Sequence, residues 1–512
     1  MSDSVKQGAP LYDALLRYKE AKLASFHVPG HKNGQAYKIG SSNPAAELAQ
    51  VMGIDVTEIT GTDDLHHPEG VIKEAQQRAA TFFGAEETYF LVGGSTAGNL
   101  ALILSVCTAP GDVLLVQRNV HQSVIHGLML AQAQAVFLAP QQHGASGLAT
   151  IPSIETVREA LRWHPGAKGL LVTHPNYYGM GASLAELAEL CHAHGVPLLV
   201  DEAHGAHYGL HPALPLSALA QGADGVVQST HKMLAALTMG AMLHVQGSLL
   251  DRSLLRQRLA MVQSSSPSYP IMASLDLSRH LLEQQGHAAF SEGLAAADWL
   301  RQAIRSQLPR FGIVQTGASG EDAAYTTQDP FKLVLYDAAG FWSGYELQAK
   351  LEEAGCIPEM SDERYVVLAL SLGTTREDAE RLYHALQNMA GDKTSALASV
   401  STWNIESGLG LADGVSNPVP FMMQPRSQKE IEAVLVEDSL GRVAAEMIIP
   451  YPPGIPLLYP GEAISEKALQ RLKGLRQSGA KCQGAADSQL NTILVYKHLD
   501  KEQTEGGNTN EK

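Results

Sequence analysis

Cysteine is scarce in this chain of 512 residues, which has only Cys107, Cys191, Cys356 and Cys482, widely spaced and without a CxxC pair. Such spacing offers neither a disulfide framework nor the paired thiols of a zinc site, and it is typical of reduced thiols in the cytoplasm. No apolar run approaches the ~20 residues of a membrane helix. The N-terminal sequence also lacks the apolar core of a signal peptide. We therefore expect a soluble, cytoplasmic protein without a membrane partner.

Positive charge is also in short supply. The chain has 37 Lys and Arg against 53 Asp and Glu, a formal net charge of −16. Nucleic acids and anionic membranes attract basic surfaces, so this balance argues against either as the main partner. Hydrophobic residues make up 45% of the chain, which is enough apolar material for buried cores. At ~100–200 residues per domain, the length predicts about three or four domains.

Seven short apolar runs each predict a buried strand. They are residues 87–93, 112–116, 135–139, 169–173, 196–202, 224–229 and 240–245. Helix-like segments lie between several of these strands, at residues 97–107, 120–132, 153–163 and 183–194. Near-continuous apolar strands separated by helices are typical of a mainly parallel sheet that is covered on both faces. The predicted fold class is therefore α/β, with a seven-stranded sheet.

The remaining sequence predicts how the chain divides into domains. Strand-like and helix-like segments alternate again after residue 330, which indicates a smaller α+β domain. A less regular and partly proline-rich stretch follows, and the end of the chain is polar. The predicted parts are an N-terminal segment (1–70), a large domain (71–310), the small α+β domain (311–390) and a C-terminal domain with a frayed tail (391–512).

A glycine-rich turn, GGSTAGN (93–99), follows the first predicted strand and opens a helix. Backbone N–H groups around Gly94, with the hydroxyls of Ser95 and Thr96, would form a phosphate cradle at the positive end of that helix. The sequence lacks the Gly-Lys-Ser/Thr ending of a P-loop and the spacing of a dinucleotide motif. On its own, the turn is equally consistent with a tight connection and a capping serine.

An acidic and a basic residue stand at the ends of two later strands. Asp201 follows the run VPLLV, and Lys232 ends Ser-Thr-His-Lys (229–232) directly after another apolar strand. Asp201 has a structural alternative, since such a residue can cap a helix or bind a metal. Lys232 has one too, because lysine is usually a solvated surface residue.

Three histidines near Asp201 raise the possibility of a metal site. His204, His207 and His211 do not have the HExxH spacing, and glycines at 205 and 209 make a helix carrying all three unfavourable. We therefore expect no metal at this position.

The carboxyl ends of parallel strands meet at one edge of a sheet, so these motifs are expected to share one crevice. Together they supply what pyridoxal phosphate requires: an amine for the aldehyde, a cradle for the phosphate and a carboxylate for the ring nitrogen. His121, after the second strand, could lay its ring against the cofactor, or it could simply pack at the start of a helix.

In these motifs the chain resembles the Orn/Lys/Arg decarboxylase family of fold-type I, aspartate-aminotransferase-like, pyridoxal-phosphate enzymes. The matching segments, in family order, are HVPGHK (27–32), DVTEITGTDDLHHPEGVI (55–72), GGSTAGN (93–99), RNVHQSVIHGL (118–128), DEAHGAHYG (201–209), QSTHK (228–232), SSSPSY (264–269) and PYPPGIPLLYPGE (450–462). The resemblance spans residues 10–465, and the length is similar to that of the short, biosynthetic-type members, which include arginine decarboxylases.

The resemblance implies a role for each matching residue. Lys232 would hold the cofactor as an imine, Asp201 would pair with the pyridinium nitrogen, and His121 would stack on the ring. His231 and Lys232 are both candidates for the group that protonates Cα after CO2 is lost. Cofactor contacts are also implied for Gly94, Ser95, Thr96, Ala203, His204, Ser229 and His231, and for Ser264 reaching from a neighbouring subunit. A homodimer or higher homo-oligomer is thereby implied.

Three departures from the family pattern bear on the substrate pocket. Gln122 stands where many members have Lys, THPNYYG (173–179) replaces a commoner Ser-Pro-Thr-Tyr-type run, and His204 stands where some large members have Trp. These departures leave the cofactor residues intact.

The function that the resemblance implies is decarboxylation of a basic amino acid. L-Arginine, giving agmatine for polyamine biosynthesis, is the first expectation; lysine, giving cadaverine, is the second, and ornithine, giving putrescine, the third. Glu462 is one candidate for binding the distal cation of the substrate. An aminotransferase or lyase of the same fold would share Asp201 and Lys232, whereas a non-catalytic scaffold would be expected to lose one of them.

Overall fold

The computed structural model describes residues 8–37, 46–315, 324–391, 414–423, 430–451 and 454–497. The chain forms two compact units: one holds the described residues up to Phe421, and the other holds those from Met422 onward. The predicted domain boundary at residue 391 adjoins residues 392–413, which lie outside the described residues, so that boundary stays a prediction.

An eight-stranded sheet forms the centre of the first unit, in the order β1-β8-β7-β6-β4-β2-β3-β14. Its strands are β1 (Glu87–Leu91), β2 (Val113–Gln117), β3 (Gln134–Leu138), β4 (Leu170–Thr173), β6 (Leu198–Asp201), β7 (Gly225–Gln228), β8 (Ala241–Val245) and β14 (Val419–Pro420). All seven predicted strands are confirmed, and with them the α/β class. The two-residue β14, which pairs with β3, is an addition that the sequence did not reveal.

Most neighbouring strands in this sheet are parallel. β8 is antiparallel to both β1 and β7, and β14 is antiparallel to β3. β7, β6, β4, β2 and β3 are successively parallel. Because β1 and β7 both oppose β8, β1 runs in the same direction as the parallel strands. Six of the eight strands therefore end at the same edge of the sheet.

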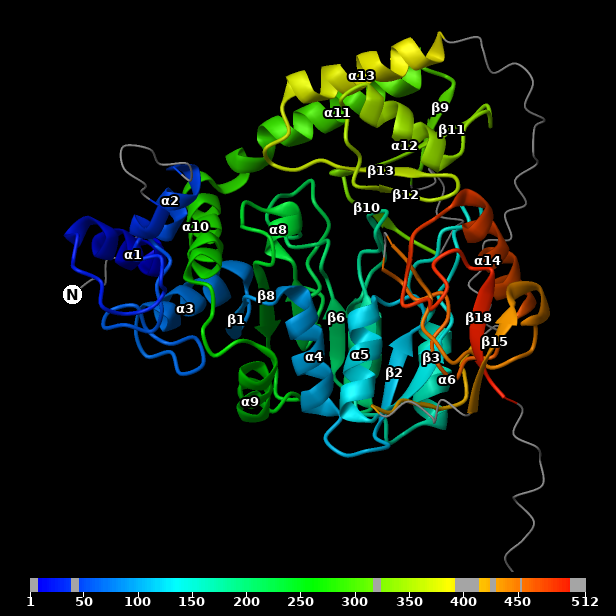
Figure 1. Ribbon diagram of the computed structural model, residues 1–512, viewed down its shortest axis with the longest axis horizontal. Helices are drawn as coiled ribbons and strands as arrows, with labels where there is room; N and C mark the ends of the chain where they lie inside the picture. Colours follow the sequence, from blue (N-terminus) through cyan, green and yellow to red (C-terminus); the bar gives the residue numbers. More distant parts are fainter. Residues whose placement is uncertain are drawn as a thin grey trace, which may run out of the picture. The chain divides into compact units, whose positions relative to one another are not determined.

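Helices cover both faces of the sheet, as the apolar strands require. Leu198 and Val200 of β6 pack in one cluster with α6 (Ile154–Trp163) and α7 (Ala185–Ala193). Leu199 points to the other face of the sheet. There, the side chains of Leu199 and of Leu102 in α4 both lie against Gly225, which has no side chain of its own. α4 (Gly94–Val106) and α5 (Gln122–Ala131) pack side by side on that face (Figure 1).

The chain leaves the sheet through a series of helices. α8 (Thr230–Met233) follows β7, and after β8 come α9 (Arg252–Val262), α10 (Tyr269–Gln285) and α11 (Ser291–Gln307). The predicted interruption at residues 264–270 is confirmed, since α9 ends at Val262 and α10 begins at Tyr269. At the N-terminus, α1 (Pro10–Ala21) packs against α3 (Val71–Phe83) and α10.

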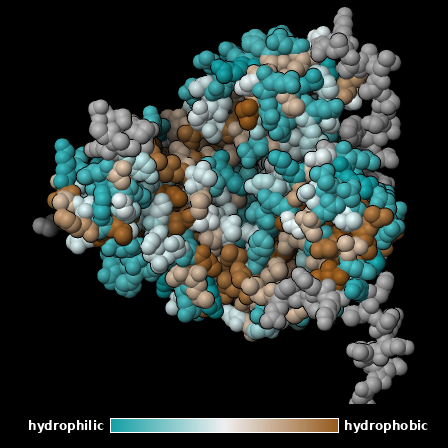
Figure 2. Space-filling model, viewed as in Figure 1, coloured by the Kyte–Doolittle hydropathy of each residue, from teal (hydrophilic) through white to brown (hydrophobic). Residues whose placement is uncertain are grey.

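The small α+β domain is an antiparallel sheet of order β12-β13-β11-β9. Its elements are β9 (Phe311–Ile313), β11 (Lys332–Asp337), α12 (Gly344–Glu353), β12 (Met360–Ser361), β13 (Val366–Ala369) and α13 (Arg376–Ala390). Its core joins these strands to α11 and α13, whose outer surface is mainly hydrophilic (Figure 2). A short pair, β5 (Met180–Gly181) with β10 (Thr327–Gln328), joins the large sheet's connections to the segment that leads into β11.

The second unit has a core of its own. β15 (Ile431–Leu435) pairs with β18 (Thr492–Tyr496), and α14 (Glu466–Ser478) buries Leu472 and Leu475 against the same core as Ile493 and Val495. None of the described helices is both long enough and apolar enough to cross a membrane.

Candidate active site

The candidate residues follow strands that end at one edge of the large sheet. They are Gly94 after β1, His121 after β2, residues 174–179 after β4, Asp201 at the end of β6 and Lys232 after β7. These five strands run in the same direction, so the turns that follow them share that edge. The small domain faces it, with α8 between the sheet and the small domain (Figure 1).

The glycine-rich turn leaves an open space at the start of α4. Gly94 has φ +71, a conformation that side chains rarely adopt, and a Cβ built on it would meet nothing within 4 Å. Ser95 is half-buried and Thr96 is exposed in the first turn of this 13-residue helix, which no side chain in the described part of the chain caps. The N–H groups of Ser95 and Thr96 in this first turn therefore suit an anion.

The loop that ends at Gly240 joins this turn to the lysine. The backbone N–H of Gly94 donates to the carbonyl of Met239 (3.0 Å). The neighbouring carbonyl of Gly240 accepts from the N–H of His231 (3.1 Å) and from its ring nitrogen Nδ1 (3.0 Å). Burial, and to a lesser extent the nearby Lys232, lower the pKa of His231. The structure thus brings the glycine-rich turn and the lysine turn together.

Asp201 is 3% exposed, and both of its carboxylate oxygens are held. Oδ2 accepts from the side-chain amide of Asn99 (2.9 Å) and Oδ1 from the N–H of Ala203 (3.2 Å). Asn99 belongs to α4, the helix that carries the cradle, and its amide also donates to Ser123 Oγ (3.0 Å). The orientation of the carboxylate is therefore fixed from two sides.

His121 stands at the N-cap of α5, on the same hydrogen-bonded chain. Its Nδ1 lies 2.9 Å from Ser123 Oγ and accepts from the N–H of Ser123. Burial lowers the pKa of His121, and the charge of Lys232 lowers it further, while the charge of Asp201 acts in the opposite direction. The structure therefore places His121 within the electrostatic reach of both Asp201 and Lys232.

Lys232 is half-buried in the short helix α8. Its Nζ lies 3.1 Å from Nε2 of His204 and 5.4 Å from the centre of the Tyr177 ring. Burial lowers the pKa of Lys232, against the charges of Asp201 and Glu359, which raise it. A lysine in such surroundings loses its proton more readily than a solvated one, and a neutral amine is a nucleophile.

His204 is 3% exposed and makes a second contact with a lysine. Its Nδ1 lies 3.3 Å from Nζ of Lys332, the first residue of β11, and its ring lies 4.4 Å from that of Tyr177. Burial, together with the charges of the two lysines, lowers the pKa of His204 well below its usual value. The imidazole of His204 is therefore neutral.

Three further predicted residues lie nearby or at the periphery. Ala203 is buried beside Asp201, and the Oγ of Ser229 is buried without a hydrogen-bond partner among the described residues. Ser264 is exposed, and its carbonyl accepts from Nε2 of His66 (2.8 Å). The adjacent Gln263 accepts from the N–H of Val92, so this loop touches the end of β1.

Four residues at the site had not been singled out from the sequence: Asn99, Tyr177, Lys332 and Glu359. Asn99 and Tyr177 were within quoted motifs but had no assigned role. Lys332 had a detectable signal, because it is a charged residue at the start of an otherwise apolar strand, FKLVLYD (331–337). Glu359 had none, since one exposed carboxylate before a two-residue strand resembles many others.

The three histidines of the DEAHGAHYG segment take different partners, which argues against a shared metal. His204 contacts the two lysines, and His207 pairs with the buried Asp329 (3.0 Å). Nδ1 of His211 accepts from the N–H of Ala213. Among the described residues, no group of three His, Cys, Asp or Glu side chains could hold a metal ion.

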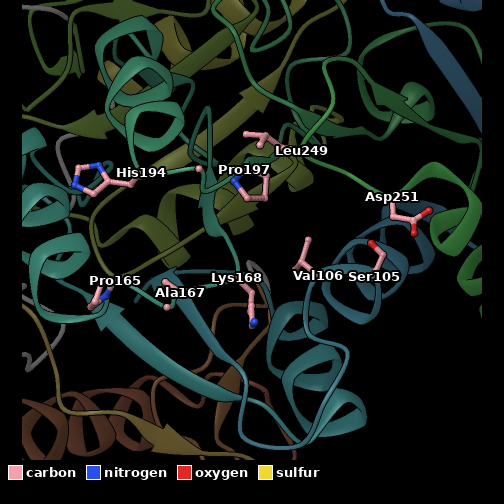
Figure 3. Close-up of a pocket in the computed structure, with 11 residues that line it drawn as sticks. Ser105, Val106, Pro165, Ala167, Lys168, His194, Pro197, Leu249 and Asp251 are labelled. Carbon is pink, nitrogen blue, oxygen red and sulfur yellow. The ribbon is translucent and has the colours of Figure 1, made fainter.

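A cavity of ≈ 380 Å³ lies at the opposite edge of the large sheet (Figure 3). Lys168 and Pro197, which line it, precede β4 and β6, and Ser105 comes from the last turn of α4. The amino ends of the parallel strands therefore border this cavity, and none of the candidate residues lines it.

Family models match most of the chain. The model described as "Orn/Lys/Arg decarboxylase, major domain" matches residues 9–378, and that of the C-terminal domain matches residues 422–487. The chain belongs to the Orn/Lys/Arg decarboxylase family and is an amino-acid decarboxylase, as the sequence motifs predicted.

Individual relatives agree with this assignment. The chain is 41% identical to the uncharacterized protein YaaO of Bacillus subtilis, over 96% of this chain and 99% of that one. It is 35% identical to an arginine decarboxylase of Halalkalibacterium halodurans, over 96% and 99% of the two chains. The solved structure of the constitutive lysine decarboxylase of Escherichia coli has the same fold, with a TM-score of 0.76, 24% identity and coverage of 96% of this chain and 82% of that one.

Proposed function

We propose that this protein is a pyridoxal-phosphate-dependent decarboxylase that converts L-arginine to agmatine and CO2. The observation that carries the proposal is the placement of Asp201 at the end of β6 and of Lys232 after the adjacent parallel strand β7, at the same edge of the sheet. Each acts electrostatically on His121, so both reach the same space. The arginine decarboxylase relative supports arginine as the substrate.

The residues present fit the cofactor. The first turn of α4 offers open space at Gly94 and the N–H groups of Ser95 and Thr96 for a phosphate. The buried Oγ of Ser229 has no partner in the described part of the chain, and a phosphate oxygen would satisfy it. Both oxygens of Asp201 are held in place, which suits a carboxylate that must keep one ring nitrogen protonated.

When bound, the cofactor supplies a protonated ring that draws electron density from Cα as CO2 leaves. In the proposed site, Lys232 would hold the cofactor's aldehyde carbon and Asp201 would stabilise the proton on its ring nitrogen. His121 and Ala203 would pack against the ring. Gly94, Ser95, Thr96 and Ser229 bind the phosphate, and His204 and His231 border the lysine.

Of the two candidates for the Cα proton donor, the geometry favours Lys232. The carbonyl of Gly240 can only accept, so the hydrogen of the His231 ring lies on Nδ1, 3.0 Å from that oxygen. With its pKa lowered mainly by burial, the His231 ring is neutral, and its Nε2 then has no proton to give. The amine of Lys232, in contrast, has a proton to give when it is an ammonium group.

A basic substrate needs an acidic partner for its distal cation. Glu359, which precedes β12, is exposed, and its charge acts on Lys232, His231 and Lys332. We propose that its carboxylate binds the guanidinium. Glu462 lies in the second unit, so its role stays a prediction. Lysine and ornithine remain the alternative substrates, since a single carboxylate also pairs with an ammonium.

We further propose a cytoplasmic homodimer in which Ser264 contacts the phosphate bound by the neighbouring subunit. Large apolar side chains are exposed in and beside the HVPGHK segment and near Ser264: Phe26 is 95% exposed, Val28 64% and Met261 67%. Such side chains would be buried where a partner subunit covers them. Analytical ultracentrifugation would test this, and a purely monomeric active enzyme would contradict it.

The experiment that tests the function is a substrate panel. Purified protein with pyridoxal phosphate is given carboxyl-labelled arginine, lysine and ornithine, and released CO2 and amine product are measured. We expect agmatine and CO2 in equal amounts, with the highest kcat/KM for arginine. A keto acid in place of an amine would indicate an aminotransferase, and absence of CO2 from all three substrates would refute the proposal.

A further inference from the structure

The ring of His204 lies between two lysines. Nζ of Lys232 is 3.1 Å from its Nε2, and Nζ of Lys332 is 3.3 Å from its Nδ1. The two lysines come from different domains, Lys232 from the turn after β7 and Lys332 from β11 of the small domain. A single buried imidazole therefore connects the lysine of the candidate site to a second amine that is 2% exposed.

Hydrogen-bond counting limits the protonation of this trio. A neutral imidazole has one N–H donor and one lone pair, and an ammonium group can only donate. If both lysines were ammonium groups, one of them would face the ring N–H, donor against donor. At least one lysine must therefore be a neutral amine that accepts from the ring.

Two arrangements satisfy this condition. In the first, Lys232 is the ammonium and donates to Nε2, while Nδ1–H donates to the neutral amine of Lys332. In the second, Lys332 is the ammonium and donates to Nδ1, while Nε2–H donates to the neutral amine of Lys232. Moving one proton from Lys232 to Nε2 and one from Nδ1 to Lys332 converts the first into the second. No charge is gained or lost, and only the ring tautomer changes.

We propose that His204 and Lys332 form a proton relay that takes a proton from Lys232 and returns it. Lys332 is a positioning residue in this scheme: it touches neither substrate nor cofactor and acts through His204. The inference rests on the proposed function, because Lys232 must lose a proton to become a nucleophile and must carry one to protonate Cα. Burial favours the first arrangement at rest, since Lys232 is half-buried and Lys332 is almost fully buried.

Other charged groups around the relay also influence its protonation. Asp329 and Glu359 act on Lys332, and Asp201 and Glu359 act on Lys232. His121 and His207 act on His204. A variant that tests the relay must therefore leave these side chains in place.

The test measures the protonation of Lys232 directly, in the cofactor-free protein. Acetic anhydride acetylates only neutral amines, so the labelling rate of the Lys232 peptide, followed by mass spectrometry, reports the neutral fraction at each pH. Lys332→Arg places a permanent cation at Nδ1, which forces Nε2–H toward Lys232 and keeps Lys232 neutral. Lys332→Met removes the proton acceptor, so Lys232 keeps its proton.

The two substitutions should therefore have opposite effects. At pH 7 we expect labelling of Lys232 to rise about tenfold in the Arg variant and to fall about tenfold in the Met variant, as for a pKa change of about one unit. A merely structural role for Lys332 would loosen the site in both variants and raise labelling in both. Lys73→Arg and Lys73→Met, at an exposed lysine of α3, are the matched controls and should change nothing.

A second pair of variants tests whether the effect passes through His204. In a His204→Phe background, the difference between Arg and Met at position 332 should shrink at least tenfold, leaving only repulsion through space. Thermal unfolding confirms that each variant folds. If the Met variant does not fold, Lys332→Gln replaces it, because its amide oxygen accepts from Nδ1 and likewise leaves the proton on Lys232.

Equal or same-direction changes for Arg and Met at position 332, or a difference that survives in the His204→Phe background, would overturn the relay. The labelling uses neither cofactor nor substrate, so its outcome is independent of whether arginine is decarboxylated. In the loaded enzyme, both variants should lower kcat about tenfold or more with little change in KM. Failure of the substrate panel would instead refute the proposed function.

Discussion

Two groups of residues meet at the candidate active site, and they differ in how they are held. The large-domain group is Gly94, His121, Asp201 and Lys232; the small-domain group is Asp329, Lys332 and Glu359. Members of the first group stand at or after the ends of buried strands of the large sheet and are tied to each other by hydrogen bonds through α4 and the Gly240 loop. Members of the second group lie at or just before the starts of β11 and β12 in the small domain.

This difference separates two tasks. The large sheet supplies a fixed frame in which the amine, the carboxylate and the cradle keep their relative positions. The small domain supplies charges that act on that frame, through His204 in the case of Lys332 and electrostatically in the case of Glu359. We therefore expect substitutions in the large-domain group to stop the chemistry, and those in the small-domain group to alter protonation and substrate affinity.

The largest effect is expected for Lys232→Ala. It removes the amine that is proposed to hold the cofactor, so turnover should fall to background and the absorbance of covalently attached cofactor should disappear. Lys168→Ala, at an exposed lysine on the opposite edge of the sheet, is the control and should keep both. If Lys232→Ala kept both activity and absorbance, Lys232 would not be the residue that holds the cofactor.

Asp201→Asn should have the next largest effect. The amide keeps the shape of the carboxylate but loses the charge that would stabilise a protonated ring, and we expect kcat to fall about 10²–10³-fold. Asp224→Asn is the matched control, because Asp224 holds the N–H of Leu198 at the opposite end of the same strand. If kcat fell equally in both variants, the role of Asp201 would be structural.

Glu359→Gln should affect binding more than chemistry. Losing one charge-assisted contact of about 1.5 kcal/mol would raise KM for arginine roughly tenfold and leave kcat nearly unchanged. Glu353→Gln, at an exposed glutamate of α12, is the control. A fall in kcat with unchanged KM would place Glu359 in the chemistry and would contradict its role in binding the guanidinium.

The same division explains what the sequence could predict. The large-domain group follows apolar strands, and a strand end in a parallel sheet has a known place, so Asp201 and Lys232 could be assigned to one crevice. All seven strands of four or five residues in the large sheet were predicted for the same reason. β14, β5 and β10 are two residues long, which is too short for any periodicity to indicate them.

The small-domain contacts depend on tertiary packing that no local pattern encodes. Lys332 reaches His204 because β5 pairs with β10 and so positions the segment that leads into β11. The pairing of His207 with Asp329 joins residues 122 positions apart in the chain. Sequence reasoning considered His204 and His207 as metal ligands and gave His204 a cofactor contact, but it had no means of finding the lysine and the aspartate that face them.

Within the large domain, Glu202 can be compared with Asp201, because the two acids are adjacent in the chain and Glu202 is fully buried. Its oxygens accept from the N–H of Ala218 (2.8 Å) and the side chain of Gln228 (2.7 Å), with no cation among its described partners. Burial raises the pKa of Glu202 to about 8. It is therefore protonated in the folded protein at pH 7 and ionised in the unfolded chain.

This raised pKa makes stability depend on pH. The folded state binds the extra proton between the unfolded pKa of 4.5 and the folded pKa of about 8, so the stabilising contribution is full below pH 4.5 and is lost as the pH rises toward 8. Glu202→Gln cannot ionise and should make the thermal midpoint less dependent on pH between 5 and 8, with kcat little changed. Glu189→Gln, at an exposed glutamate of α7, should keep the wild-type slope. An unchanged slope in Glu202→Gln would mean that Glu202 is ionised in the folded protein at pH 7.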